Sequence, residues 1–170
     1  PYMIANAKVN NKTESLTYRV YRPKKVEFVD LSNSSAMRTY VRSLCFILAK
    51  AVDDILPQAK MYIEHAVSKG YYFHIDSEVP VGKTELDAVR NRMKEIVKAD
   101  IPFIQVEEET EVVADLFKKL GKDDKAQLLE TSDLLYARYS KLGNYIDYFY
   151  GCLTPSTGYI NMFDIQPHNG

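Results

Sequence analysis

The chain has no tryptophan, and it has only two cysteines, Cys45 and Cys152, among 170 residues. Two cysteines cannot form the disulfide framework of a small secreted domain, so we expect a cytoplasmic protein with reduced thiols. No apolar run approaches the ~20 residues that span a bilayer, and no signal peptide is recognised at the start. We therefore expect no membrane partner.

The sequence also lacks a strong excess of charge of either sign. Its formal net charge is −1, with 22 Lys and Arg against 23 Asp and Glu. Such a chain has no overall positive field to attract nucleic acid, so any such role would need a local basic patch. Its 46% hydrophobic and 26% charged content is typical of a globular protein of one or two domains.

Tyrosine, by contrast, is abundant, with 13 residues, and six of these lie between Tyr136 and Tyr159. Proteins that stack single-stranded RNA on aromatic rings interleave those rings with Lys and Arg. Only Arg138 and Lys141 are basic in this run. We therefore interpret the tyrosines as part of a half-exposed antiparallel sheet, where the ring packs and the hydroxyl meets water.

Hydrophobic periodicity in the first half predicts strands and helices in alternation. Ser34 or Ser35 is expected to cap the first helix, and Gly70 to allow a tight turn between two strands. The expected strands are 4–10, 16–22, 26–30, 60–67 and 71–76, and the expected helices are 36–56 and 84–99, the second capped by Thr84.

The second half continues the α+β pattern. Thr110 is expected to cap a helix that ends at Gly121, and Gly143-Asn144 to turn a hairpin. The remaining expectations are a strand at 101–108, a helix at 123–130, hairpin arms at 135–142 and 145–151, and a last strand at 158–165.

One stretch looks like a phosphate-binding loop. SEVPVGKT at 77–84 follows an expected strand, opens an expected helix and ends in Gly-Lys-Thr. However, Ser77 stands where the first glycine belongs, and Pro80 has no N–H to aim at a phosphate. Glu78 would repel the ligand. We interpret the stretch as a connector capped by Thr84.

The histidines and cysteines do not form a recognisable site on their own. His65 and His74 lie on the two arms of one expected hairpin, but no H-x-x-x-H or C-x-x-C spacing supplies further zinc ligands. His168 lies in a tail that we expect to be frayed. Cys45 is expected to be a core residue of the first helix. Cys152 has no local base to keep it as a thiolate, so we expect it to be inert.

Four segments together resemble the editing domain of threonyl-tRNA synthetases, which alanyl-tRNA synthetases share. They are VRSLCFILAKAVDDILPQAKMYIEHAVSKGYYFHID (41–76), ELDAVRNRMKEIVKADIPFIQVEEETEVVADLFKKLG (85–121), KAQLLE (125–130) and YIDYFYGCLTP (145–155). The resemblance implies an α+β fold, a two-layer antiparallel sheet with packed helices, over residues 36–166. Residues 1–31 resemble the last strands of the preceding β-grasp, or TGS-like, module.

The site of that family has the form H-x-x-x-H on the first helix and C-x-x-x-H in a late strand-turn, and these groups hold zinc or activate water. The corresponding positions here are Arg42, Phe46, Phe149 and Leu153. None of these side chains can bind a metal or take up a proton at neutral pH. Cys152 lies three positions after the family cysteine. The resemblance therefore implies a degenerate site with no catalytic residue and no metal.

Three segments, RTYVRSLCFIL, IEHAVSKGYY and YGCLTPSTGYI, resemble another group more closely than they resemble the synthetases. In this group of bacterial proteins, the same domains precede a P-loop kinase of the uridine kinase type. This resemblance implies a non-catalytic binding or regulatory module, covalently linked to a nucleoside kinase domain. ATP and Mg²⁺ would bind only in that kinase domain, and this segment would need no cofactor. The alternative is an aminoacyl-tRNA-editing hydrolase or RNA-binding domain of a threonyl-tRNA synthetase-like protein.

Arg42 is expected to face the former pocket beside Phe149 and Leu153. An arginine there is costly to bury unpaired, so it should meet a carboxylate, backbone carbonyls, solvent or an anionic ligand. A nucleotide or RNA ligand, a purely structural role and a homodimer contact all stay open. The candidate ligand groove consists of Arg42, His65, Tyr71 and Cys152.

Overall fold

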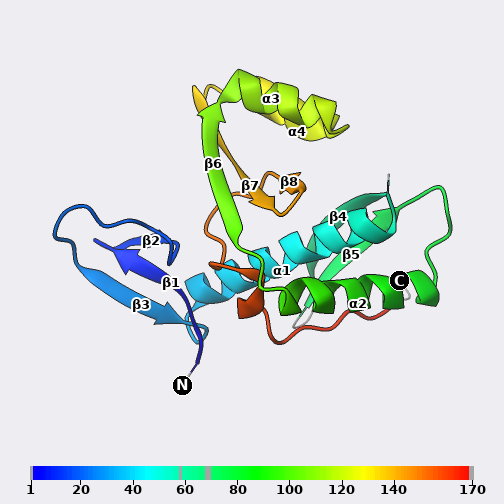
Figure 1. The fold of residues 1–170 in the computed structure, drawn as a ribbon, viewed down its shortest axis with the longest axis horizontal. Helices are drawn as coiled ribbons and strands as arrows, with labels where there is room; N and C mark the ends of the chain where they lie inside the picture. Colours follow the sequence, from blue (N-terminus) through cyan, green and yellow to red (C-terminus); the bar gives the residue numbers. More distant parts are fainter. Residues whose placement is uncertain (1, 58, 68–69, 169–170) are drawn as a thin grey trace. The chain divides into compact units, whose positions relative to one another are not determined.

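The computed structural model describes residues 2–57, 59–67 and 70–168. All strand pairs in these residues are antiparallel, and they form three small sheets in the orders β2-β1-β3, β4-β5 and β6-β7-β8 (Figure 1). Four α-helices accompany them in the described residues, which confirms the α+β class. The chain divides into two compact units, Pro1–Pro102 with Cys152–Gly170 (unit 1) and Phe103–Gly151 (unit 2).

The first sheet of unit 1 contains β1 (Ile4–Val9), β2 (Lys12–Glu14) and β3 (Val26–Asp30). The expected strand at 16–22 is wrong, because the chain turns back much earlier. Asn10 and Asn11 both adopt positive φ, 47° and 68°. Asparagine tolerates this conformation, and two such residues make the two-residue turn that best joins antiparallel strands. β1 therefore pairs with β2 across this turn and with β3 on its other side, and residues 16–22 contain no strand.

Helix α1 (Ser34–Ile55) is the main helix of unit 1 and begins at a different cap from the expected one. The Oδ1 atom of Asn33 accepts a hydrogen bond from the backbone N–H of Ser35 at 2.9 Å. Asparagine is as good an N-cap as serine, so Asn33 takes the role expected of Ser34 or Ser35. Ala36 on the first turn packs with Ala5 and Val29 of the sheet. Pro57 follows the end of the helix.

The predicted hairpin after α1 is confirmed as β4 (Lys60–Val67) and β5 (Gly70–Asp76). Ser68 and Lys69 of its turn lie outside the described residues, and the expected turn conformation of Gly70 is untested. Helix α2 (Lys83–Lys98) follows. Its expected cap, Thr84, is wrong, because Gly82 is the N-cap and donates its N–H to Oε2 of Glu85 at 2.9 Å.

Residues 152–168 complete unit 1 without the expected strand at 158–165. Instead, a short 3-10 turn covers Thr157–Tyr159. The hydroxyl of Thr157 donates to the carbonyl of Ile96 at 2.7 Å and accepts from the N–H of Ile101 at 2.9 Å. These bonds connect the segment to the end of α2 rather than to a neighbouring strand. Alternation of apolar and polar residues therefore misled the strand prediction.

Unit 2 contains β6 (Phe103–Glu109), α3 (Thr110–Lys119), α4 (Asp123–Glu130), β7 (Tyr136–Leu142) and β8 (Tyr145–Asp147). The expected arm at 145–151 is therefore shorter than predicted. The expected cap of α3, Thr110, is wrong, because Glu109 is the N-cap and Thr110 is the first helical residue. Gly121 ends α3 with φ of 70°, and the N–H of Lys122 donates to the carbonyl of Phe117 at 2.9 Å, as in a Schellman cap. Gly143 turns the β7–β8 hairpin with φ of 59°.

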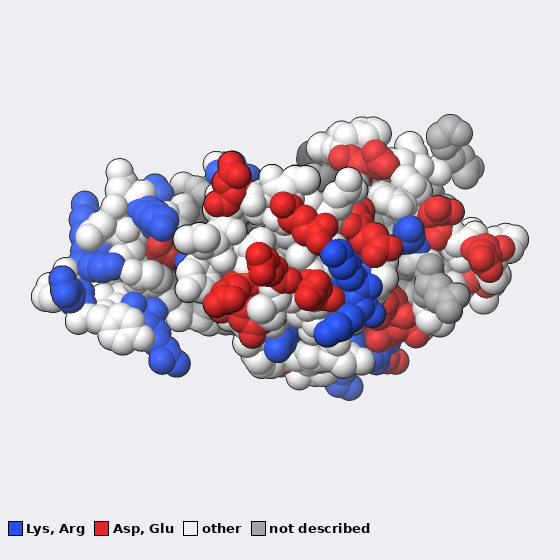
Figure 2. All heavy atoms as spheres, turned by 90° about the horizontal axis from the view of Figure 1, so that it is seen from above, with Lys and Arg blue, Asp and Glu red and all other residues white. Residues whose placement is uncertain are grey.

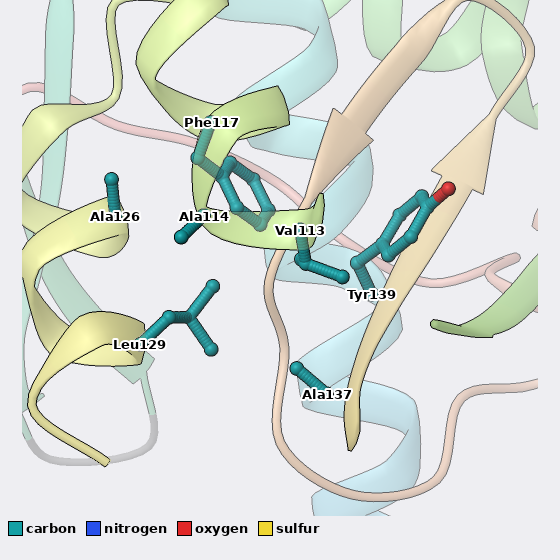
Figure 3. Close-up of a cluster of buried hydrophobic side chains, with 7 residues drawn as sticks. All are labelled: Val113, Ala114, Phe117, Ala126, Leu129, Ala137 and Tyr139. Atoms are coloured by element: carbon teal, nitrogen blue, oxygen red, sulfur yellow. The ribbon is translucent and has the colours of Figure 1, made fainter. Parts of the chain in front are cut away.

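Both helices of unit 2 pack on β7 through a small apolar core (Figure 3). The rings of Phe117 and Tyr139 meet edge to face with centroids 6.5 Å apart. The buried members of this core are Val113, Ala114, Phe117, Ala126, Leu129, Ala137 and Tyr139. Within the described ranges, no helix of either unit combines the length and apolar content needed to cross a membrane.

Candidate functional site

The middle of α1 carries two of the four positions where the resemblance places site residues. Arg42 and Phe46 are four residues apart, so they lie on the same side of the helix. Phe46 is fully buried, and Arg42 is half-buried. Both therefore belong to the packed side of α1.

The segment Cys152–Thr154 is attached to α1 at these positions by two hydrogen bonds. Nη1 of Arg42 donates to the carbonyl of Cys152 at 2.6 Å, and the N–H of Thr154 donates to Oγ of Ser43 at 2.8 Å. Leu153 lies between the two attached residues and is 7% exposed. The structure thus brings another of the four positions, Leu153, to the part of α1 that carries Arg42.

The partner of Arg42 is a backbone carbonyl. Among the described residues, no carboxylate pairs with it. Burial lowers the pKa of Arg42 from its ordinary value, and a guanidinium nevertheless keeps its charge in proteins. This arginine can donate hydrogen bonds, but it cannot accept a proton from water.

The two thiols are held in their neutral form. Burial raises the pKa of Cys45 to about 11. Burial and then the nearby Glu14 carboxylate raise the pKa of Cys152, against smaller opposite effects of Arg42 and Lys12. The Sγ atom of Cys152 lies 3.7 Å from the carbonyl of Thr13 and donates to it. A nucleophilic cysteine needs a lowered pKa, so neither thiol is suited to that role.

The other two predicted groove residues lie on the β4–β5 hairpin. The ring of His65 lies 5.7 Å from that of Tyr72, and Tyr71 is 51% exposed. Tyr71 lines an open cavity of about 380 Å³ with Lys83 and His168, among others. In the described part of the chain, no hydrogen bond, ion pair or ring contact joins His65 or Tyr71 to Arg42 or Cys152.

The other two histidines, His74 and His168, contact aromatic rings. Nδ1 of His74 lies 3.0 Å from Glu64, and its ring stacks on Tyr62. The rings of His168 and Tyr72 meet in a T-shaped contact with centroids 5.6 Å apart, and the expected fraying of the tail stays a prediction. No group of three or more potential metal ligands occurs in the ranges that the structure describes.

The stretch 77–84 does not present a free helix N-terminus. The N–H of Gly82, which a phosphate would need, donates to the carboxylate of Glu85. An incoming phosphate would have to displace this negative group, which lies within the same helix. The local geometry therefore agrees with the interpretation of this stretch as a connector.

Phe149, the remaining family position, belongs to unit 2 and lies two residues after Asp147, the centre of a charged cluster. Burial raises the pKa of Asp147, but the ammonium groups of Lys125 and Lys122 outweigh it, and the net shift is downward. Lys125 pairs with Oδ1, Lys122 lies 3.2 Å from Oδ2, and the hydroxyl of Tyr145 donates at 2.8 Å. Lys125 also lies 6.0 Å from the centre of the Phe149 ring.

Sequence reasoning missed this cluster of Asp147, Lys122 and Lys125. The lysines are more than 20 residues away from the aspartate, so no local motif connects them. The only available signal was an aspartate in a strand of aromatic residues, a position where an unpaired charge would be costly.

No family model matches the chain, but comparison with individual curated proteins finds relatives. Its curated relatives are threonine–tRNA ligases. The protein of Desulforamulus reducens is 32% identical over 153 residues, which cover 89% of this chain and 24% of the relative. The protein of Syntrophomonas wolfei is 29% identical over 159 residues, which cover 92% of this chain and 25% of the relative. The protein of Geobacter sp. (strain M21) is 29% identical over 141 residues, which cover 83% of this chain and 22% of the relative.

These relatives confirm the resemblance to threonyl-tRNA synthetases over most of the chain. The chain spans about a quarter of the length of the curated relatives that it matches. The similarity therefore concerns a segment of these ligases and not a complete ligase.

Proposed function

We propose that this region is a non-catalytic module built on the fold of the threonyl-tRNA synthetase editing region. One observation carries the proposal. Where the family has zinc-binding or water-activating groups, this chain has Arg42 bonded to a backbone carbonyl, together with the buried apolar side chains of Phe46 and Leu153. The module would therefore serve binding or architecture rather than ester hydrolysis.

The chemistry of deacylation explains why these replacements matter. Hydrolysis of an aminoacyl ester needs a water activated by a general base or by a metal ion. Phenylalanine and leucine offer no lone pair, and the guanidinium of Arg42 offers none while it is charged. Burial keeps Cys45 and Cys152 protonated at neutral pH. None of these groups can activate water.

The domain division is part of the same proposal. Residues 1–31 would be the last strands of a β-grasp module, and residues 36–166 would be the editing-like domain. The β2-β1-β3 sheet precedes α1 in the chain, as this division requires, and it packs on the first turn of α1 within unit 1. From the resemblance to proteins that contain a kinase of the uridine kinase type, we further propose a linked kinase domain, where ATP and Mg²⁺ would bind.

The relatives favour a second possibility for the full-length, or parent, protein. This is a threonyl-tRNA synthetase-like protein, in which this region would contact RNA. The coding sequence after residue 170 distinguishes the two parents. A G-x-x-x-x-G-K-[ST] motif after a strand would indicate the kinase. A long continuation that resembles threonine–tRNA ligases would contradict that parent.

A metal-binding experiment tests the loss of the site itself. The chain and its variant Arg42→His/Phe46→His/Leu153→His would be titrated with Co²⁺, whose visible absorption reports tetrahedral coordination. We expect no such absorption from the natural chain. The triple variant should bind one ion, because it places two histidines one helical turn apart and a third on the attached segment.

A matched control is Arg38→His/Phe46→His/Leu153→His, which has the same number of histidines at a different helical spacing. It should bind Co²⁺ at least about tenfold more weakly than the first variant, with far-UV circular dichroism verifying that both fold. Stoichiometric binding by the natural chain would refute the proposal. A folded triple variant that binds no better than the control would refute the assignment of these positions.

A further inference from the structure

Basic side chains are concentrated in one short part of unit 1. Between residues 8 and 25 there are six Lys and Arg residues and one acidic residue, Glu14. Glu14 is paired with Lys12 at 3.5 Å. The rest of the chain is consequently net negative. Figure 2 shows Lys and Arg side chains gathered at the left end, the side where Figure 1 draws β1–β3.

The stretch YRVYRPKK, residues 18–25, alternates these cations with aromatic rings; we call it the basic loop. Each of its tyrosines, Tyr18 and Tyr21, is followed directly by an arginine. Tyr21 is 82% exposed and Tyr18 is 37% exposed. Nζ of Lys24 lies 4.9 Å from the centre of the Tyr18 ring. Rings and cations are thus presented together on one exposed segment.

The cations of the basic loop are not neutralised by the protein. Among the described residues, Arg19, Arg22, Lys24 and Lys25 have no ion pair with a carboxylate. Every residue from 17 to 28 is exposed. Uncompensated surface charges of one sign create a local field that attracts a polyanion.

One end of the basic loop is bonded to the turn between β1 and β2, and the other end begins in a local turn just after β2. The backbone of Asn10 donates to the carbonyl of Lys25 at 2.9 Å, and Oδ1 of Asn10 accepts from the N–H of Lys25 at 3.0 Å. At the other end, the N–H of Tyr18 donates to the carbonyl of Ser15 at 3.0 Å. Pro23 restricts the backbone between these ends. These constraints reduce the entropy that binding would cost.

From these observations we propose that the basic loop binds single-stranded RNA. Its arginines and lysines would contact phosphates, and the exposed rings of Tyr18 and Tyr21 would stack on unpaired bases. A duplex would satisfy only the first requirement, because its bases are already stacked on one another. This inference does not depend on the loss of hydrolysis at α1.

Fluorescence anisotropy with the 170-residue chain and a labelled, unstructured RNA of about 12 nucleotides tests the proposal. The variant Arg19→Glu/Arg22→Glu should bind at least about tenfold more weakly and show a shallower salt dependence between about 50 and 200 mM. The control Lys94→Glu/Lys98→Glu makes the same charge change on the exposed face of α2 and should bind within about twofold of the natural chain. Equal losses in the two variants would refute a local site.

A second pair of variants tests stacking separately from charge. Tyr21→Ala should weaken RNA binding by about fivefold or more, whereas Tyr21→Phe keeps the ring and should stay within about twofold. Because Tyr21 is exposed, neither change should unfold the chain. Binding to heparin, which has charge but no bases, should not respond to Tyr21→Ala.

Three outcomes would overturn the RNA proposal. The first is no RNA binding by the natural chain at about 50 mM salt. The second is RNA binding that is unaffected by Tyr21→Ala, which would indicate a charge-only surface. The third is tighter binding to vesicles of phosphatidylserine than to RNA, with the same dependence on Arg19 and Arg22, which would indicate a membrane surface.

Discussion

Nη1 of Arg42 lies 2.6 Å from the carbonyl oxygen of Cys152, which is 110 residues later in the sequence. With the bond from Thr154 to Ser43, this contact attaches the segment after unit 2 to the middle of α1. Arg42, at a position where the resemblance implies a ligand, is thus a structural link. It holds the returning chain in unit 1 and leaves no lone pair there for a metal.

Removal of this link should destabilise the protein. Arg42→Ala is expected to lower the free energy of unfolding by about 1–2 kcal/mol, because the carbonyl of Cys152 loses a charged donor. Arg38→Ala, one turn earlier and exposed, should change it by less than about 0.5 kcal/mol. Urea denaturation followed by circular dichroism measures both, and equal effects would show that the contact contributes nothing specific.

Thr157 should be a second stabilising point of the same segment. Thr157→Val keeps the shape of the side chain but leaves the N–H of Ile101 without its hydroxyl partner. Because Thr157 is fully buried, we expect a loss of about 1–3 kcal/mol. Thr17→Val makes the same change at an exposed position and should be nearly neutral. A neutral Thr157→Val would indicate that water replaces the bond.

Asp147 should make the stability of unit 2 dependent on pH. Its pKa in the folded state is lowered, since Lys125 and Lys122 outweigh the opposite effect of burial. Its contribution is therefore present above the ordinary aspartate pKa of about 3.9 and is lost as the pH falls through the lower folded value. Asp147→Asn should cost about 1–3 kcal/mol at pH 7 and progressively less below pH ~4.

Urea midpoints measured between pH 7 and pH 2 for Asp147→Asn and the natural chain test this prediction. Asp133→Asn, at an exposed position, is the control and should differ little at any pH. A cost of Asp147→Asn that is independent of pH would show that charge is not the cause.

The cysteines should react slowly in the folded protein. With a pKa of about 11, only about one Cys45 thiol in a thousand is ionised at pH 8. Cys152→Ser isolates Cys45, and its reaction with a disulfide reagent should accelerate at least about tenfold in urea. A fast reaction of Cys45 in the native protein would contradict its burial on α1.

Local chemistry explains which parts of the fold could be predicted. The helix stripe of α1, the Gly121 cap and the Gly143-Asn144 turn each depend on residues close in sequence, and all three agree with the structure. The strand at 16–22 failed because Asn10 and Asn11 close the hairpin earlier. The strand at 158–165 failed because backbone groups of this segment bond to side chains of other elements, Gly158 to Asp100 and Met162 to Tyr40, and not to a neighbouring strand.

In the candidate site, too, features that depend on side-chain identity differ from those that depend on contacts between distant residues. The degenerate positions are a prediction from the family resemblance, in which side-chain identity alone decides whether a donor is present. The bond from Arg42 to Cys152 and the cluster around Asp147 required the tertiary structure. The basic loop was missed because a net charge of −1 averages it with the acidic remainder.

Deacylation of a mischarged aminoacyl-tRNA would show directly whether this chain hydrolyses the ester, which we propose it does not. The chain would be incubated with the labelled substrate with and without Zn²⁺, beside a threonine–tRNA ligase as a positive control. We predict that the ester is lost at the rate seen in buffer alone, at every protein concentration. Saturable, protein-dependent release of the amino acid would contradict the account.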